Sequence, residues 1–405
     1  MRIFFISNYF PGELGPLARE LAARPENEVL FASSRQRKGF ALAGVRRVRL
    51  KNVPLFGDAP PTVPGLWEEA ARRGASGLRS LESLRESWGA PDMVFASLAG
   101  GAALFVPQAF PGAFLTAYAE TGLKNFPLLP EAARRAWILL QSSLFLQADL
   151  CFAHGEAQRR LFPRALREDI RLVPPSVDAE VFSRAAARPW RGEEGVAAPS
   201  GPGRLLTLDA TGLAGPALAL WLRVAHGVLG ALPDCQVVML LENARLREAL
   251  LAAVAAWPKA RRERLAAFNS LPFERYRDLL AASSLVVCPG RGAGAERAML
   301  EAMSCETLLM AHAGAANFLR PGVNMLELPR AEAGAEPHGG AVEEIFGAVV
   351  AALEAQRRGA DAAPTPQGRM ARRNVLAHFS EATVVPRHLA EVMRACAAWQ
   401  KERGA

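Results

Sequence analysis

The sequence predicts an α/β protein built from two Rossmann-like domains, each with a parallel sheet. Three observations support this prediction. Short apolar segments typical of strands alternate with longer segments of helical periodicity, which favours parallel strands joined by helices. The alternation stops in a polar, Pro/Gly-rich stretch at 184–203 and then starts again. The chain has 405 residues, which is too many for one ordinary core.

The first half opens with a predicted strand at 2–7. A turn containing Pro11, Gly12 and Gly15 follows it, and then a predicted helix at 16–24 with proline at its start, where proline suits the helical entry geometry. The other predicted strands of this half lie at 28–32, 45–50, 93–97, 113–119, 149–153 and 171–173, and its other helices at 66–88, 131–147 and 156–162.

The second half repeats the pattern. Its predicted strands lie at 204–208, 235–241, 265–269, 285–288 and 307–311, and its helices at 217–232, 245–256, 275–282, 298–305, 341–357, 368–379 and 381–401. We therefore expect an N-terminal domain at 1–183, a linker at 184–203, a C-terminal domain at 204–380 and a C-terminal helix at 381–405 that packs back toward the N-terminal domain. Two such halves are expected to face a central cleft, with a ligand at the carboxyl ends of the strands.

Cysteine usage and hydropathy narrow the cellular context. The five cysteines are scattered, with no Cys-x-x-Cys pair, which argues against a zinc site and a disulfide framework and indicates a reducing compartment. The start of the chain lacks a basic secretory leader, and no apolar run approaches the roughly 18 residues of a membrane span. We expect a cytoplasmic protein, or one peripheral at the inner face of the membrane.

The formal net charge is +8, and the basic residues are almost all arginine. This positive charge permits three interpretations. It reflects a compositional bias, an attraction to anionic phosphates on a ligand or a membrane surface, or nucleic-acid binding. No aromatic-interleaved basic motif supports the third, so we expect no nucleic-acid partner. The segment 131–147, with Arg134 and Arg135 near its start, fits either a membrane-interface helix or a core helix, and its apolar residues on more than one face favour the core.

Five segments, in order along the chain, resemble glycosyltransferases of the GT-B fold, in particular the retaining family-4 group. They look like the family's first strand and glycine-bearing loop, its inter-domain segment, the strand before its donor loop, the helix start that carries its second donor glutamate, and its Gly-Gly turn. These segments are 3–12, 173–182, 281–289, 300–305 and 312–314. The resemblance covers nearly the whole chain. It implies a metal-independent transfer of a sugar, with retention and without a cofactor, from a nucleoside-diphosphate donor to a glycan, lipid-linked or protein acceptor.

The resemblance also implies a donor site in the C-terminal domain. In the family, two glutamates separated by seven residues contact the donor, and the second holds the ribose hydroxyls, because a carboxylate can accept two hydrogen bonds from a vicinal diol. Glu301 matches the second glutamate; its other interpretation is an ordinary first-turn glutamate favoured by the helix dipole. The first glutamate falls at Ala293, and Glu296, three residues later, is the catalytic candidate in its place.

The donor phosphates need positive charge and amide donors. Arg291, with Gly290, Gly292 and Gly294 around it, forms a basic loop that fits this role or else a surface loop. His312 and Gly314 fall at the donor loop. The family's Arg and Lys after the first strand of this domain are missing from 208–216; the candidate replacements are Arg2, Arg223 and Arg320.

In the N-terminal half, Gly12 and Gly15 permit close approach of a donor to the backbone, although a loop turn explains them equally well. Glu120, after Tyr118 at the end of a strand, is the candidate for a catalytic role on the acceptor side. For His154 a packed or capping role is favoured over a functional one.

The leading hypothesis is therefore a hexosyltransferase-type glycosyltransferase. The rival is a degenerate GT-B protein that binds a ligand or partner without catalysis, as the missing Arg/Lys pair and Ala293 suggest. A GT-B epimerase or phosphorylase has no positive support: a phosphorylase needs a lysine for pyridoxal phosphate, and the C-terminal half offers only Lys259 and Lys401, neither well placed.

Overall fold

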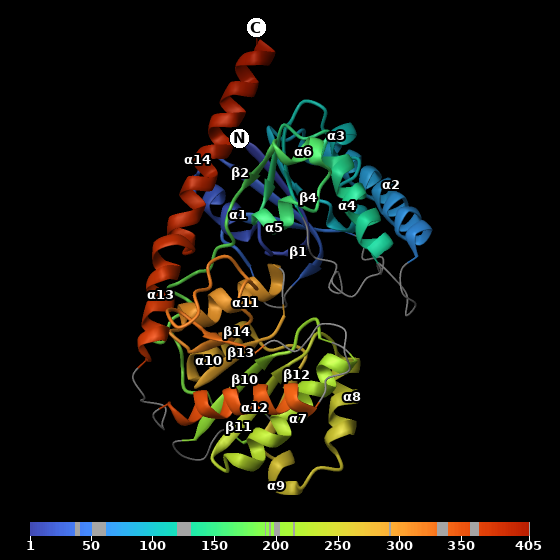
Figure 1. The fold of residues 1–405 in the computed structure, drawn as a ribbon. Coiled ribbons are helices and arrows are strands. Elements are labelled where there is room, and N and C mark those ends of the chain that lie inside the picture. Colours follow the sequence, from blue (N-terminus) through green and yellow to red (C-terminus); the bar gives the residue numbers. More distant parts are fainter. Residues whose placement is uncertain are drawn as a thin grey trace. The chain divides into compact units, whose positions relative to one another are not determined.

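A computed structural model describes the chain in two compact units (Figure 1). The described residues are 1–36, 41–50, 62–119, 131–190, 192–193, 196–197, 203–213, 215–290, 293–329, 339–356 and 364–404. The first unit comprises Met1–Pro175 and Ala382–Ala405, and the second comprises Ser176–Glu381. Residues 176–183, which the sequence analysis placed in the N-terminal domain, lie in the second unit.

The first unit contains a seven-stranded parallel sheet with the strand order β3-β2-β1-β4-β5-β6-β7. The order reverses between β1 and β4, which makes this a topological switch point, the place where ligands bind in open α/β sheets. The strands are β1 (Arg2–Phe10), β2 (Glu28–Gln36), β3 (Val45–Arg49), β4 (Met93–Ser97), β5 (Phe114–Tyr118), β6 (Leu150–Ala153) and β7 (Ile170–Leu172).

Helices cover both faces of this sheet, which is why its central strands are continuous apolar runs. Phe4 and Ile6 of β1 face the helices α2 (Val63–Trp88), α3 (Val106–Ala109) and α4 (Glu131–Phe145). Ile3 and Phe5, the alternate residues, face α1 (Gly15–Ala22) and α14 (Glu381–Gly404). The unit also contains η1 (Ala99–Gly101), α5 (Glu156–Arg159) and α6 (Arg164–Arg167).

The second unit contains a six-stranded parallel sheet with the order β12-β11-β10-β13-β14-β15 and a switch point between β10 and β13. Its strands are β10 (Arg204–Asp209), β11 (Cys235–Leu240), β12 (Leu265–Phe268), β13 (Leu285–Cys288), β14 (Leu309–Ala311) and β15 (Leu326–Glu327). The short pair β8 (Gly192–Glu193) and β9 (Val196–Ala197) is antiparallel and lies in the predicted linker stretch.

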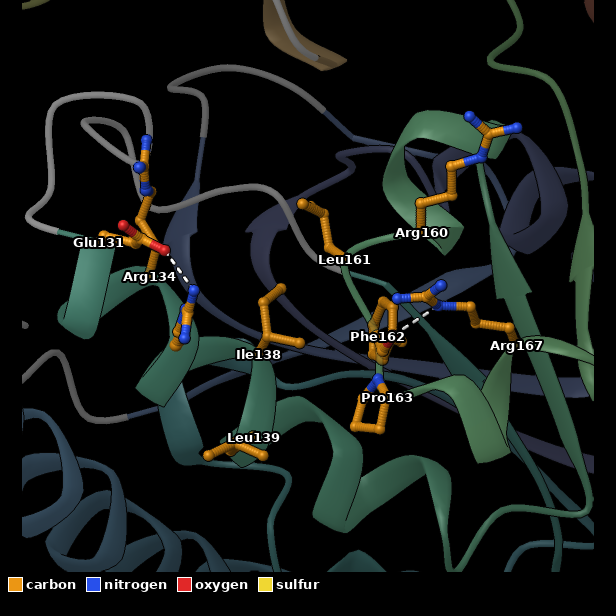
Figure 2. Close-up of a pocket in the computed structure, with 10 residues that line it drawn as sticks. Glu131, Arg134, Ile138, Leu139, Arg160, Leu161, Phe162, Pro163 and Arg167 are labelled. Carbon is orange, nitrogen blue, oxygen red and sulfur yellow. Dashed lines mark hydrogen bonds and ion pairs between the residues drawn. The ribbon is translucent and has the colours of Figure 1, made fainter.

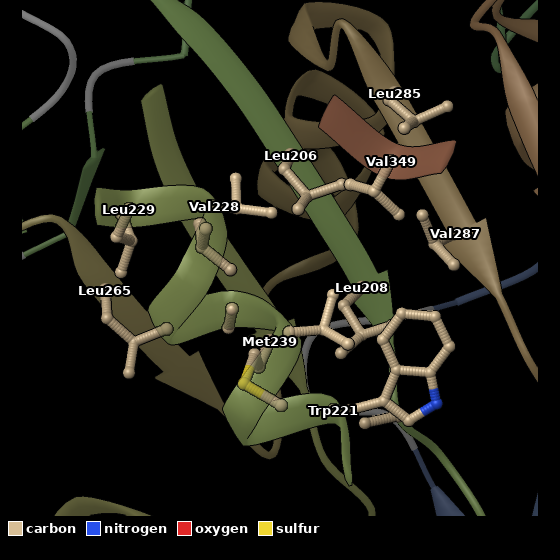
Figure 3. Packing of buried hydrophobic residues seen from close by; sticks show 14 of the residues in the cluster. Leu206, Leu208, Trp221, Val228, Leu229, Met239, Leu265, Leu285, Val287 and Val349 are labelled. Carbon is tan, nitrogen blue, oxygen red and sulfur yellow. The ribbon is translucent and has the colours of Figure 1, made fainter. Parts of the chain in front are cut away.

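One face of the second sheet packs against α7 (Pro216–Ala231), α8 (Ala244–Val254) and α12 (Gly339–Glu354), as the core around Leu208, Trp221 and Val349 shows (Figure 3). The opposite face packs against α10 (Phe273–Ala282), α11 (Ala293–Ser304) and α13 (Pro366–His378). The helix α9 (Lys259–Arg262) lies between α8 and β12 in the chain. Two Rossmann-like parallel sheets confirm the predicted α/β class.

Several predicted elements differ in extent. The helix predicted at 298–305 begins five residues earlier, at Ala293, and the one predicted at 156–162 already ends at Arg159. A separate short helix, α6, follows after its N-cap Pro163. The segment predicted at 131–147 is a core helix along most of its surface, yet Leu139 and Leu146 on it are exposed. Among the helices that the structure describes, none combines the length and the apolar character that a membrane crossing needs.

Candidate functional site

The centre of the candidate site is the carboxylate of Glu301, which is almost completely buried in the second unit. Its side chain is 8% exposed. The hydroxyl of Tyr276, on α10, donates to Oε2 of Glu301 at 2.9 Å. Nε of Arg297, one turn earlier on α11, donates to Oε1 at 3.0 Å, as the i,i+4 spacing permits. Both carboxylate oxygens are therefore held in a defined orientation.

A second buried carboxyl group belongs to the same electrostatic environment. Asp209 is the last residue of β10, and its Oδ1 accepts hydrogen bonds from the amide (3.1 Å) and the hydroxyl of Thr211. Burial raises the pKa of Asp209, and the negative charge of Glu301 adds to this effect. Burial also raises the pKa of the Tyr276 phenol, and the charge of Glu301 is the next largest cause of this shift. The hydroxyl therefore stays protonated and remains a donor. Parallel strands place Asp209 and the end of β13 at the same edge of the sheet, beside the switch point.

The position of Glu301 in its helix differs from the prediction. Because α11 begins at Ala293, Glu301 lies near the C-terminal end of the helix, where its carbonyl accepts from the amide of Cys305. The prediction of a helix-start glutamate is therefore wrong, and so is the interpretation that the helix dipole favours it in the first turn. Glu296 lies in the first turn of α11. Five residues correspond to about 140° around a helix, so Glu296 and Glu301 project from different sides of α11.

The structure describes only some of the other predicted donor residues. Arg291 and Gly292 lie outside the described residues. His312 follows β14 directly, and its carbonyl accepts from the amide of Ala315 in a turn. Gly314 takes φ +76° in that turn, a conformation that favours glycine, and a Cβ there would meet nothing within 4 Å. The turn lies at the same edge of the sheet as the end of β13, because β13 and β14 are parallel neighbours.

The three arginines considered as replacements occupy different places. Arg2 begins β1 in the first unit, at the amino edge of that sheet, and forms an ion pair with Glu28 at 3.6 Å. Arg223 lies on α7, where it lines a small pocket together with residues of α8. Arg320 is exposed in the segment after β14. The cation that the structure places on Glu301 is Arg297, which the sequence analysis missed, although its i,i+4 spacing from Glu301 is visible in the sequence.

In the first unit, local geometry accounts for the two predicted glycines. Gly12 has φ +53°, and a Cβ there would lie 2.8 Å from the carbonyl oxygen of Tyr9. A Cβ on Gly15 would lie 2.5 Å from Cβ of Pro11. Both distances are too short for real contacts, so the turn between β1 and α1 requires glycine at both positions.

The same turn carries a polar contact that the sequence analysis missed. Oε2 of Glu13 lies 2.8 Å from Nε2 of His154, which follows β6, and Nδ1 of His154 lies 3.3 Å from the carbonyl oxygen of Val173. His154 therefore joins the ends of three strands rather than simply capping a helix.

Glu120 lies outside the described residues. The hydroxyl of Tyr118 is hydrogen-bonded to Nε2 of His388 at 2.9 Å.

Comparisons with known proteins agree with this fold. The two Rossmann-like sheets define the GT-B class, and residues 25–125, within the first unit, match the family described as Glycosyl transferase family 4 group. The chain is similar over 98% of its length to all of sucrose-phosphate synthase from Thermosynechococcus elongatus (TM-score 0.67, 15% identity). It is also similar, over 98% of its length, to all of HepE from Anabaena in complex with UDP and glucose (TM-score 0.65, 14% identity).

A third solved structure has a different described activity. It is a putative UDP-N-acetylglucosamine 2-epimerase from Listeria monocytogenes, with TM-score 0.55, 13% identity and coverage of 93% of this chain and 95% of that one. None of the curated proteins matches the sequence. At these identities the structural similarity establishes the fold, and together with the family match it confirms the resemblance to GT-B glycosyltransferases.

Proposed function

We propose that this protein transfers a sugar from a nucleoside-diphosphate donor to an acceptor. The GT-B fold and the glycosyltransferase match over residues 25–125 support this proposal. So does HepE, a structural relative determined with UDP and glucose. The observation that carries the proposal is the buried, oriented carboxylate of Glu301 in the second unit, whose charge acts on Asp209 at the edge where strand order reverses.

Each group around Glu301 has a chemical role in this proposal. The carboxylate accepts hydrogen bonds from the two ribose hydroxyls of the donor, because it has more acceptor sites than its two protein contacts use. Tyr276 keeps the carboxylate in position. Arg297, whose side chain is 40% exposed, is the cation that reaches the donor diphosphate, because a guanidinium matches phosphate geometry.

The finer features of the reaction belong to the same proposal. We infer transfer with retention and without a metal ion, a hexosyl donor, and a glycan, lipid-linked or protein acceptor. Glu296 and Glu120 remain the proposed catalytic carboxylates, and Arg291, Gly292, His312 and Gly314 the proposed donor contacts beside Glu301. We also propose that the protein is located in the cytoplasm.

A second candidate function is ligand or partner binding without turnover. Two features favour it. Both oxygens of Glu301 already accept hydrogen bonds from protein groups. In addition, the end of β10, next to the segment where the resemblance implies cations for the diphosphate, carries the buried carboxyl of Asp209.

A screen of nucleotide sugars distinguishes the two functions. Donor binding is measured by thermal shift, since a ligand at about 100 times its dissociation constant adds about 2.7 kcal/mol of apparent stability. Turnover is measured as release of the nucleoside diphosphate. Glu301→Ala is compared with Glu263→Ala, which removes an exposed glutamate of the same unit.

The transferase proposal predicts donor binding that Glu301→Ala weakens and turnover that it abolishes, whereas Glu263→Ala leaves both unchanged. Donor binding without turnover, with or without an acceptor extract, would establish the second function. A folded protein that binds none of the donors would refute the proposal.

A further inference from the structure

The first unit contains a pocket that the proposed donor site does not use. Its volume is about 670 Å³, and it lies between α4 and the segment 160–167, which includes α6 (Figure 2). The lining residues that the structure describes all belong to the first unit, whereas Glu301 belongs to the second.

The lining is strongly basic. Among the described residues, four arginines and one carboxylate, that of Glu131, line the pocket, and the arginines are Arg134, Arg135, Arg160 and Arg167. Figure 2 shows Arg134 on one side of the pocket and Arg160 and Arg167 on the other. Arg135 follows Arg134 on α4. Guanidinium groups on two sides of one hollow form a site for an anion, because several can contact different oxygens of the same phosphate.

For Arg135, Arg160 and Arg167, the contacts within the protein only partly neutralise the positive charge. Arg135 forms an ion pair with Glu131, and Nε of Arg160 lies 3.0 Å from Oε1 of Glu156, which Arg159 also contacts. Nε of Arg167 donates to the carbonyl oxygen of Phe162 at 2.8 Å, so this contact positions the guanidinium without cancelling its charge. The side chains of Arg135 and Arg160 are 77% and 72% exposed, so an incoming anion can reach them.

Apolar side chains lie beside the arginines. Ile138 and Phe162 form a buried floor, while Leu139 and Leu161 are 51% and 46% exposed. Leu146, still more exposed, directly follows the end of α4. Single exposed leucines need no explanation, but leucines at the rim of an arginine-lined pocket match a ligand with a charged head and an apolar body.

We propose that this pocket binds the phosphate of an anionic lipid headgroup and thereby seats the first unit on an anionic bilayer. The arginines contact the headgroup, and Leu139 and Leu161 enter the boundary between headgroups and acyl chains. The positive charge of the arginines favours an anionic bilayer over a neutral one. The exposed leucines favour a lipid over a small soluble anion, which has no apolar part for them to contact. The proposal does not depend on sugar transfer.

The test is sedimentation of the protein with vesicles of phosphatidylcholine alone or of phosphatidylcholine with phosphatidylglycerol. We expect binding only to the second kind, weakening as salt is added. Arg135→Glu combined with Arg160→Glu should lower the partition coefficient by at least about tenfold. Leu139→Gln combined with Leu161→Gln should weaken binding at every salt concentration. The matched control is Arg72→Glu, which reverses an exposed, ion-paired arginine of α2 that does not line the pocket.

Circular dichroism and thermal unfolding establish that each variant is folded. If the double charge reversal does not fold, Arg160→Gln replaces it, because Glu156 keeps its contact with Arg159 at 2.6 Å. Equal binding to both kinds of vesicle, no binding to either, or unchanged binding by the pocket variants would overturn the proposal. Displacement from vesicles by inorganic phosphate at constant ionic strength would also overturn it, because the pocket would then take a soluble anion.

Discussion

Tyr276 and Glu301 come from different helices, and the hydroxyl of Tyr276 donates to Oε2 of Glu301 at 2.9 Å. Burial raises the pKa of this phenol, and the adjacent carboxylate raises it further. The contact therefore holds the buried, negatively charged carboxylate of Glu301 in one orientation. This is the arrangement expected of a carboxylate that recognises a ligand, and it also contributes to stability, so the two effects must be separated by experiment.

Tyr276→Phe tests the structural part of this contact. The ring still packs against Phe182, but the buried carboxylate loses a donor. We expect the free energy of unfolding to fall by about 1.5–3 kcal/mol, the usual value for a hydrogen bond to a charged group. Urea denaturation measures this change. An unchanged free energy of unfolding would mean that the contact does not hold Glu301 in solution.

Arg297→Ala separates binding from stability. The ion pair with Glu301 is an i,i+4 pair with a substantially exposed arginine, so its loss should cost only about 0.5 kcal/mol of stability. Donor affinity should fall by about tenfold, because a charge-assisted contact to the diphosphate is lost.

The control for that variant is Lys259→Ala, which removes the cation of an exposed i,i+4 pair in the same unit. Titration calorimetry with the active donor compares the two. Equal donor affinities in the two variants would exclude a role for Arg297 at the diphosphate.

Glu306→Gly should stabilise the end of α11, the helix that carries Glu301. Glu306 adopts φ +58° just after the helix, a conformation that costs a side-chain-bearing residue roughly 1–2 kcal/mol. Glycine avoids this cost, but it also loses more conformational entropy on folding, which offsets part of the stabilisation. We expect a gain of up to about 1 kcal/mol by thermal unfolding, with donor binding unchanged. A loss of stability would show that the Glu306 side chain makes a contact of greater value.

His388 should make stability depend on pH. Burial lowers its pKa from 6.5 to about 3, with a smaller contribution from His154. Between these values the unfolded chain binds a proton that the folded protein does not, so stability falls as the pH is lowered from 6.5 toward 3, by up to about 1.4 kcal/mol per pH unit.

His388→Phe should flatten this part of the stability profile. The variant should also be less stable near neutral pH, because the hydroxyl of Tyr118 loses its partner. Urea denaturation at a series of pH values measures both effects, and an equal slope in the variant and the parent would show that other groups cause the acid dependence.

Much of the fold follows from the sequence because its determinants are local. Strands such as β1 and β13 are apolar runs bounded by turn residues, and their alternation with helices is enough to predict two parallel sheets. The start of α11 was missed because Gly292 and Gly294 favour a loop, whereas the structure already continues the helix through Gly294. The strand β15 escaped prediction because it has only two residues.

The candidate site was less predictable because its contacts are distant in sequence. Tyr276 and Glu301 are 25 residues apart, and Glu13 and His154 are 141 apart. No periodic pattern links such pairs, and only folding brings them together. Glu301 itself was identified through resemblance, and Arg297 would have been identified from its spacing. Glu120, Arg291 and Gly292 stay predictions, since they lie outside the described residues.

The most direct test of a donor-binding role for Glu301 is a titration with two ligands: the active nucleotide sugar, and the same compound lacking the ribose 2′-hydroxyl. In the parent protein, removing this hydroxyl should weaken binding by about tenfold or more, because a hydrogen bond to a carboxylate is lost. In a folded Glu301→Ala variant, the two ligands should bind with equal, reduced affinity. If the variant still discriminates between them as the parent does, Glu301 does not contact the ribose.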